Sequence, residues 1–341
     1  LAPPLLLEAK RAGLSDRRIA RLRGIDEAAV ESLRRTHGIE AVYHFVDTCA
    51  GEFEARTPYF YSTWGEVDEG EPFAERAVMI LASGPNRIGQ GLEFDTCCTL
   101  ASFAYRRQGV RTIIVNSNPE TVSTDFNTSD RLYLEPPVPE TVKAVMRKER
   151  VRDVILQLGG QTPLNMAEEL EEAGARIVGT PLRAIFDTED RELFAALAAR
   201  IGLTYPPNRT ATSREQALEY AQAIGFPVLV RPSFVIGGRS MFIAYGDAEL
   251  RQLLERAPDV TETRPVIVDR FLEDAFEYDV DALCDGRTVY IAGVMEHIEA
   301  AGIHSGDSAC VFPAFKTDPG ILAEMQEQTC RIALEAGIRG F

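Results

Sequence analysis

Residues 77–115, AVMILASGPNRIGQGLEFDTCCTLASFAYRRQGVRTIIV, predict a strand, a polar loop, a long helix and a second strand in that order. The apolar runs at 77–82 and 112–115 indicate buried strands, and the helix at 93–108 ends before Gly109. The alternation continues, with predicted helices at 139–149 and 164–173 and predicted strands at 153–156 and 176–178. This rhythm favours a doubly wound α/β fold, in which a parallel sheet carries helices on both faces.

Polar loops follow the strands of this predicted sheet. The loop at 83–91 holds three glycines, but their spacing does not match the G-x-G-x-x-G fingerprint of dinucleotide-binding proteins. Pro85 also removes a backbone donor, so the sequence argues against an NAD-dependent oxidoreductase. Two further loops, at 116–121 and 159–162, follow other strands and are expected to form one polar rim with the first. Ordinary turn chemistry accounts for the same residue types.

The regions on either side of this sheet have different patterns. Residues 1–36 predict three short helices, at 5–12, 16–22 and 26–35, and residues 37–75 are expected to be an irregular arm. After residue 181 the sequence predicts an α+β unit, with helices at 189–199, 213–224, 247–257 and 321–336 and strands at 226–230, 241–245, 265–269, 277–284 and 288–295. The chain is therefore an α/β multidomain protein, divided as 1–75, 76–185 and 186–341.

Two glycine-containing segments of the last region are candidate ligand loops. In RPSFVIGGRS (231–240), a glycine pair lies between two strands and is flanked by arginines, an arrangement that suits a polyphosphate. An ordinary hairpin with solvated arginines is the alternative. The segment GIHSGDS (302–308) places His304 among glycines and hydroxyl groups, which favours a histidine that faces a ligand over a structural one.

Composition limits the classes of partner. The net charge of −16 argues against nucleic acid or an anionic membrane as the main partner. No apolar run approaches the length of a membrane span, and no secretory signal opens the sequence. The six cysteines, two of them adjacent at Cys97 and Cys98, are typical of a reduced cytoplasmic protein. The sequence begins at Leu1 and ends at Phe341 directly after a predicted helix, so we expect a piece of a longer protein.

Six segments together resemble the large subunit of the carbamoyl-phosphate synthetases. They are SGPNRIGQGLEFD (83–95), NSNPETVSTDFNTSD (116–130), GGQTPLN (159–165), EDRELF (189–194), RPSFVIGG (231–238) and GIHSGDSA (302–309). That family carries two homologous synthetase halves on one chain. The segments VDTCAGEF (46–53) and YFYST (59–63), followed by the first of the six, are similar to the second half and the part before it.

The resemblance covers nearly the whole chain and implies its organisation and activity. Residues 1–75 would belong to an oligomerisation domain, 76–185 to a pre-ATP-grasp domain and 186–341 to an incomplete ATP-grasp domain. The family's second half phosphorylates carbamate with ATP, giving carbamoyl phosphate and ADP, within glutamine-dependent synthesis for arginine and pyrimidine production. Phosphoryl transfer of this kind depends on positioning and on charge neutralisation.

The resemblance also assigns site residues and cofactors. Arg191 and Arg231 are expected beside the phosphates, and Arg231 with His304 are the expected catalytic residues. The remaining implied nucleotide contacts are Gly237 and Gly238 in a closing loop, Arg270 and Leu272 in the base-binding connector, Glu277 at the ribose, and Gly302, Ile303 and Ser305 opposite them. The implied cofactors are ATP, Mg²⁺ or Mn²⁺, and K⁺ near the segment that holds Glu296, His297 and Glu299.

The departures from the family pattern matter equally. The family's Mg²⁺ ligands, a Gln, a Glu and an Asn, would lie beyond Phe341, so no metal ligand is assigned within the chain. The implied partners are a glutaminase small subunit, the other synthetase half and further copies in an oligomer. Because divalent metal is needed to neutralise the phosphates, we expect these 341 residues alone to make no carbamoyl phosphate.

Two alternatives stay open at this point. A biotin carboxylase-like ATP-grasp ligase would share the fold, but Arg231 occupies a position that is usually Lys in those relatives, and residues 1–75 would be unexplained. A non-catalytic nucleotide-binding or assembly fragment is the other alternative. ATP affinity measured with and without Mg²⁺ separates them, because an assembly module should bind under neither condition.

Overall fold

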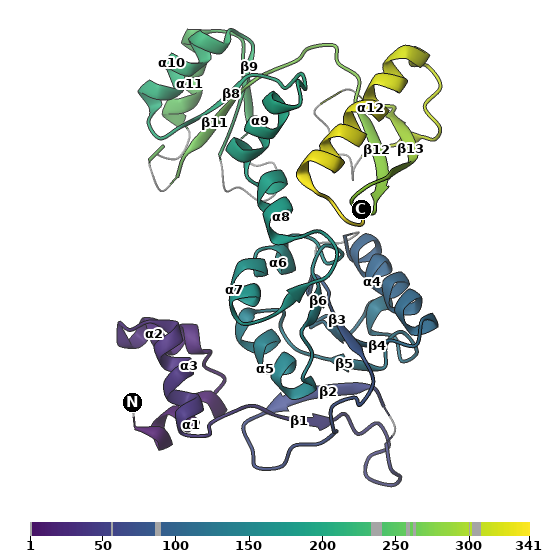
Figure 1. Cartoon of the computed structure of the whole chain (residues 1–341). Coiled ribbons are helices and arrows are strands. Elements are labelled where there is room, and N and C mark those ends of the chain that lie inside the picture. Colours follow the sequence, from purple (N-terminus) through teal and green to yellow (C-terminus); the bar gives the residue numbers. More distant parts are fainter. Residues whose placement is uncertain are drawn as a thin grey trace. The chain divides into compact units, whose positions relative to one another are not determined.

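The structure is a computed structural model that describes residues 2–341 except 56, 86–89, 233–240, 257–259, 262–263, 300 and 302–307 (Figure 1). The chain forms two compact units, Leu1–Ile185 and Phe186–Phe341, called here the N-terminal and C-terminal units. Among the described residues, no helix combines the length and the apolar character that crossing a bilayer requires.

Three helices open the N-terminal unit: α1 (Pro3–Arg11), α2 (Asp16–Arg23) and α3 (Glu27–Thr36). Their ends follow from local chemistry. The Ser15 hydroxyl caps α2 by accepting from the backbone N–H of Arg18, and Gly24 ends the helix in the left-handed conformation. Leu6 and Val30, both fully buried, are at the centre of the small core that the three helices share.

A seven-stranded sheet forms the rest of this unit, in the order β1-β2-β5-β4-β3-β6-β7. All neighbouring strands are parallel except the edge pair β1 and β2. Chain order runs outward from β3 in one direction and then in the other, so β3 and β6 flank the topological switch point. The strands are β1 (Val42–Phe45), β2 (Tyr59–Thr63), β3 (Ala77–Leu81), β4 (Arg111–Val115), β5 (Arg131–Tyr133), β6 (Asp153–Ile155) and β7 (Arg176–Ile177).

Helices cover both faces of the sheet because its central strands are apolar on both sides (Figure 1). Met79 of β3 packs in one core with residues of α5 and α7, whereas its neighbour Ile80 packs in the other core with Cys98 of α4. The helical elements are α4 (Gln90–Arg107), the short 3₁₀ helix η1 (Val122–Thr124), α5 (Pro139–Glu149), α6 (Gln161–Leu164), α7 (Ala167–Glu172) and α8 (Leu182–Glu189), whose last residues belong to the C-terminal unit. The predicted doubly wound sheet is confirmed.

Residues 37–75 differ from the irregular arm predicted from the sequence. They contain β1 and β2, which add two strands to the sheet through the parallel pairing of β2 with β5. Phe60 of β2 is fully buried and stacks on Tyr133 of β5, with the ring centroids 5.1 Å apart. This burial of aromatic surface explains why a segment rich in acidic residues is ordered as strands.

The C-terminal unit contains a four-stranded antiparallel sheet in the order β10-β9-β11-β8. Val228 and Val230 of β9 enter a core with Ala217 and Leu250 of the two helices that pack on one face of this sheet. The strands are β8 (Asn208–Ala211), β9 (Val228–Pro232), β10 (Phe242–Ala244) and β11 (Val266–Arg270), and the helices are α10 (Arg214–Ile224) and α11 (Asp247–Arg256).

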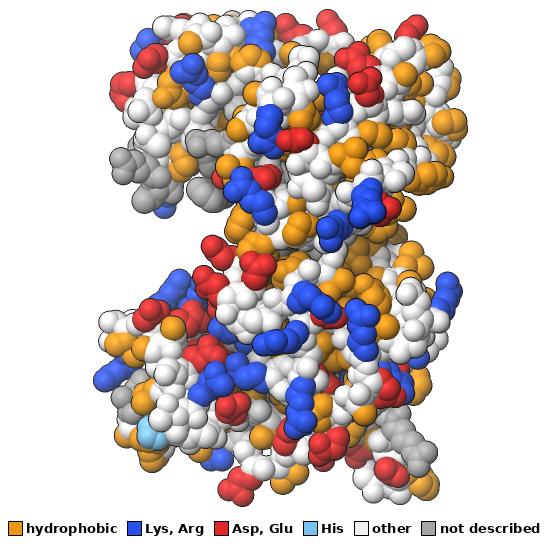
Figure 2. All heavy atoms as spheres, in the orientation of Figure 1, with side chains coloured by type: hydrophobic (Ala, Val, Ile, Leu, Met, Phe, Trp, Pro, Cys, Tyr) orange, Lys and Arg blue, Asp and Glu red, His pale blue; other side chains and the backbone are white. Residues whose placement is uncertain are grey.

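A second, three-stranded antiparallel sheet in this unit has the order β12-β13-β14. Figure 2 shows hydrophobic side chains gathered on the surface around α12 and the strands beside it. Tyr290 and Phe312 are among the exposed large apolar residues of this sheet and its following loop. The elements are α9 (Arg191–Arg200), β12 (Tyr278–Cys284), β13 (Val289–His297), β14 (Cys310–Val311) and α12 (Pro319–Ala336).

Candidate functional site

Arg231, the central residue of the predicted phosphate site, forms a two-point ion pair with Asp269. Arg231 of β9 lies opposite Ile267 of β11, and Asp269 follows two residues later, so both side chains leave the same face of the sheet. Nε of Arg231 donates to Oδ2 of Asp269 at 2.7 Å, and Nη2 donates to Oδ1 at 3.2 Å. Val230 and Val268 point into the core against α10 and α11, so the pair lies on the opposite face. The guanidinium keeps further N–H donors for a second anion.

The predicted base-binding connector between β11 and β12 begins at Arg270. Its Nη1 donates to the carbonyl oxygen of Phe226, and the backbone N–H of Phe271 donates to the carbonyl oxygen of Pro227 at 3.0 Å. Leu272, the next residue, is 53% exposed. The side chain of Arg270 thus fastens the start of the connector to the four-stranded sheet and leaves an apolar side chain facing outward.

Glu277 lies directly before β12, beside a buried histidine of the next strand. Its carbonyl oxygen accepts from the backbone N–H of His297 at 3.0 Å, and its Oε2 lies 4.0 Å from Nδ1 of His297. On the other side of the ring, Nε2 of His297 lies 3.0 Å from Oδ2 of Asp279. The structure therefore surrounds this imidazole with two carboxylates.

The carboxylates of the predicted K⁺ segment hold the backbone of neighbouring loops. Oε2 of Glu296 accepts from the backbone N–H groups of Phe315 and Lys316 at 3.1 and 3.0 Å. Oε2 of Glu299 accepts from the hydroxyl of Ser308 at 2.7 Å. The hydrogen bond from Ser308 lowers the pKa of Glu299. K⁺ binding at this segment stays a prediction.

Several predicted site residues lie outside the described part of the chain. They are Gly237, Gly238, Gly302, Ile303, His304 and Ser305. Arg191 begins α9, but its side chain is also outside that part. The structure thus places Arg231 and Arg270 on neighbouring strands of the four-stranded sheet, and Glu277 directly before the first strand of the three-stranded sheet. That all the predicted nucleotide contacts meet at one site stays a prediction.

Of the three loops predicted to form a polar rim in the N-terminal unit, those after β3 and β4 contact each other where the structure describes them, and the complete rim stays a prediction. A Cβ placed on Gly84 would lie 3.4 Å from Oγ of Ser117, so the loops after β3 and β4 are in contact. Fully buried Asp95 accepts from Nδ2 of Asn116 at 3.3 Å and from Oγ1 of Thr121 at 2.6 Å. Burial raises the pKa of Asp95, and the hydroxyl groups of Thr121 and Ser123 offset only part of that effect.

Sequence reasoning missed the acidic partners at both sheets. Asp269 and Asp279 lie in predicted strands, but no motif distinguishes them from solvated carboxylates. Their roles depend on strand register, which places Asp269 two positions from the residue opposite Arg231. One signal for Asp269 was available in the sequence. Successive side chains of the predicted strand 265–269 point to opposite faces, which sets Asp269 on the face opposite Val268.

Solved structures share the fold of this chain at low sequence identity. N5-carboxyaminoimidazole ribonucleotide synthetase, in a complex with ADP, aligns with a TM-score of 0.57 at 12% identity, covering 79% of this chain and 64% of that one. The biotin carboxylase domain of 2-oxoglutarate carboxylase from Hydrogenobacter thermophilus, solved with MgADP, ADP and bicarbonate, aligns with a TM-score of 0.58 at 18% identity. That alignment covers 76% of this chain and 58% of that one. These likenesses support the fold assignment alone.

Sequence comparisons identify the family. Residues 74–187 match the carbamoyl phosphate synthase preATP-grasp domain, and residues 190–341 match the carbamoyl-phosphate synthase L chain, ATP binding domain. The carbamoyl phosphate synthase large chain of Methanothermobacter thermautotrophicus is 52% identical over 99% of this chain and 32% of its own length. That of Vibrio cholerae is 51% identical over 98% of this chain and 31% of its own length. The chain thus spans about a third of these relatives and belongs to the carbamoyl phosphate synthase large-chain family.

Proposed function

We propose that the protein to which these residues belong phosphorylates carbamate with ATP, giving carbamoyl phosphate and ADP. The observation that carries this proposal is the match of residues 190–341 to the family's ATP-binding domain, together with about half of all residues identical to the relatives' large chains. On this proposal 1–75, 76–185 and 186–341 are the oligomerisation, pre-ATP-grasp and ATP-grasp portions.

The described side chains fit a nucleotide at the C-terminal unit. Asp269 orients the guanidinium of Arg231 at two points, so the donors left over are fixed in direction before a phosphate arrives. Exposed Leu272 suits an apolar purine face, and the carboxylate of Glu277 suits ribose hydroxyl groups. ATP supplies the phosphoryl group when bound, and Mg²⁺ neutralises its charge. The residues of this chain bind and orient the nucleotide.

The finer features of the reaction are part of the same proposal. Ammonia from glutamine would come through a glutaminase subunit, the other synthetase half would supply carbamate, and the assembly would act in the cytoplasm as an oligomer. His304 and Arg191 would contact the nucleotide phosphates, and K⁺ would bind near Glu299. Family membership supports these assignments.

The test uses the full-length protein. Incubated with ATP, Mg²⁺, bicarbonate and ammonia, it should form carbamoyl phosphate and ADP, both resolved by phosphorus NMR. A parallel reaction with free biotin and bicarbonate tests the biotin carboxylase alternative, and carboxybiotin formation there would favour that alternative. ATP turnover without carbamoyl phosphate, or tight nucleotide binding without any turnover, would reject the proposed activity.

A further inference from the structure

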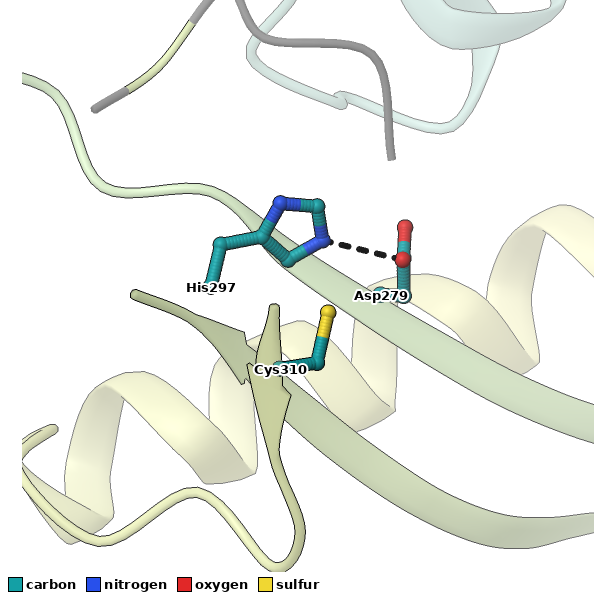
Figure 3. Close-up of side chains that lie close together, drawn as sticks. All are labelled: Asp279, His297 and Cys310. Atoms are coloured by element: carbon teal, nitrogen blue, oxygen red, sulfur yellow. Dashed lines mark hydrogen bonds and ion pairs between the residues drawn. The ribbon is translucent and has the colours of Figure 1, made fainter. Parts of the chain in front are cut away.

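Three different metal-binding side chains lie side by side on the three-stranded sheet. Asp279 of β12, His297 of β13 and Cys310 of β14 each direct a donor atom toward a common point (Figure 3). One carboxylate oxygen, one ring nitrogen and the Sγ atom all lie within 4.8 Å of one another. His297 is directly opposite Cys310 in the sheet, and Asp279 is opposite Met295, two residues earlier, so register places all three on one face.

The donor types select one class of ion. A thiolate together with an imidazole favours Zn²⁺ and similar thiophilic ions, whereas K⁺ and Mg²⁺ prefer oxygen donors. Around Zn²⁺ the bonds are about 2.0–2.3 Å long, so neighbouring donors lie about 3.5 Å apart. The 3.0 Å separation of His297 Nε2 and Asp279 Oδ2 is close to that value, and Cys310 is exposed and able to rotate. We propose that Asp279, His297 and Cys310 bind a thiophilic divalent cation such as Zn²⁺.

The surroundings of His297 fit such a ligand. The residue is 5% exposed, and its Nδ1 atom makes no hydrogen bond with any described residue. The carboxylate of Glu277 lies 4.0 Å from that atom. A metal-bound histidine usually donates its other N–H to a carboxylate, which fixes the ring and the tautomer. A small movement that brings Nδ1 of His297 within hydrogen-bonding distance of Glu277 would give this histidine the same hydrogen bond, with Nε2 directed toward the ion.

Binding also changes the proton content of the site. Without a cation, Sγ of Cys310 donates to the carbonyl oxygen of Ser308 at 3.7 Å. Although Cys310 is exposed, partial desolvation by its neighbours and the negative charges of Asp279 and Glu299 raise the pKa of this thiol. The cation therefore displaces the thiol proton to solvent, while a neutral imidazole keeps its single proton, on Nδ1, when Nε2 binds the ion. Because the thiol must be deprotonated, the affinity for the cation increases with pH. Since the strand β14 is two residues long, a bound ion would add a further link between it and the sheet.

Cobalt titration of the intact, chelator-treated protein tests the site, because Co²⁺ replaces Zn²⁺ and absorbs light when bound to thiolate. One equivalent of Co²⁺ should produce a thiolate-to-cobalt charge-transfer band that Zn²⁺ removes. Cys310→Ser should abolish the band, and Asp279→Asn should weaken Co²⁺ binding at least tenfold. Cys330→Ser on α12 is the matched control and should retain the band.

Folding is checked separately, by comparing melting temperatures of the metal-free variants with that of the parent. Asp279 is partly exposed and Cys310 is exposed, so both substitutions should leave that temperature nearly unchanged. His297→Gln is the less secure variant because its side chain is buried, and the other two variants carry the test if it unfolds. Absence of the band in the parent, or its retention in Cys310→Ser, overturns the proposal.

Discussion

Asp269 holds Arg231 at two points across adjacent antiparallel strands, with contacts of 2.7 and 3.2 Å. The pair is partly exposed, so it contributes little to the free energy of unfolding, about 1 kcal/mol or less. Its main physical consequence is orientation. A planar guanidinium pinned at Nε and Nη2 directs its other donors along fixed lines, which a flexible ammonium does not do.

We therefore predict that Arg231→Lys weakens nucleotide binding about tenfold, or about 1.4 kcal/mol, with little change in melting temperature. Calorimetric titration of the full-length protein with ATP and Mg²⁺ measures this. Arg251→Lys on α11 is the matched control, because Nε of Arg251 makes a 2.7 Å contact with Asp247 on the solvent-exposed side of that helix. Equal losses of nucleotide affinity in the two variants would contradict the proposed contact between Arg231 and the nucleotide.

The buried ion network of the helical segment gives a stability prediction. Asp16 accepts from Lys10 at 2.9 Å and from Arg34 at 3.0 Å, and each of the three side chains is 2% exposed. Asp16→Ala would leave the buried guanidinium of Arg34 without a carboxylate, while Lys10 keeps its ion pair with Glu140, so we expect a loss of about 3–5 kcal/mol. The ring centroid of Trp64, the single tryptophan, lies 4.8 Å from Nζ of Lys10. The fluorescence of Trp64 during urea unfolding therefore reports on this network.

The control for that experiment is an exposed ion pair of the same helices. Nε of Arg17 lies 3.4 Å from Oε2 of Glu27, and their side chains are 73% and 37% exposed. Glu27→Ala should therefore change the free energy of unfolding by less than about 1 kcal/mol. A similar effect of both substitutions would mean that burial of the network does not determine its contribution.

Elements with local start and stop signals could be predicted from the sequence. The helix expected at 139–149 is α5 (Pro139–Glu149), where proline occupies the first turn and Arg150 takes the left-handed conformation after it. The strand β5 (Arg131–Tyr133) was missed, because three residues after a turn-rich segment carry little periodicity. Pairing with β4 and β2, rather than local propensity, makes these residues a strand.

The candidate site was predictable only where a loop or strand end carried a motif. Arg231 and Glu277 could be named from their segments. The pairing of Arg231 with Asp269, and the meeting of Asp279, His297 and Cys310, depend on the registers of different strands. A single sequence does not contain that information, because a one-residue shift in pairing moves every side chain to the other face.

Two glycines in tight environments should respond differently to alanine. A Cβ on Gly159 would lie 2.4 Å from the carbonyl oxygen of Leu81, which belongs to the central strand β3 and has no freedom to move away. A Cβ on Gly293 would lie 2.0 Å from a ring atom of Phe312, an exposed side chain that can rotate. We expect Gly159→Ala to cost about 1–3 kcal/mol and Gly293→Ala less than that. Thermal unfolding of both variants checks the order, and the reverse order would contradict it.

Acid should weaken the attachment of α3 to α5 through one carboxylate. Glu31 accepts from Nζ of Lys143 at 2.9 Å and from Nη1 of Arg147 at 3.2 Å. Burial alone would raise its pKa, but the hydrogen bond from Lys143 and the nearby cations lower it below the ordinary value of 4.5. The ionised form is therefore favoured by folding. Its contribution is complete above the unfolded-state pKa and disappears as pH falls through the lower folded-state pKa.

Glu31→Gln should accordingly lower the melting temperature at neutral pH by about 2–4 °C, corresponding to about 1 kcal/mol. The difference from the parent should shrink steadily as pH falls below 4.5, the ordinary pKa of the group, because the parent then loses the same interaction by protonation. Glu8→Gln on α1 makes the same change of charge at an exposed position and controls for net charge. A gap between Glu31→Gln and the parent that stays constant into acid would show that Glu31 acts by packing, since packing does not depend on its ionisation.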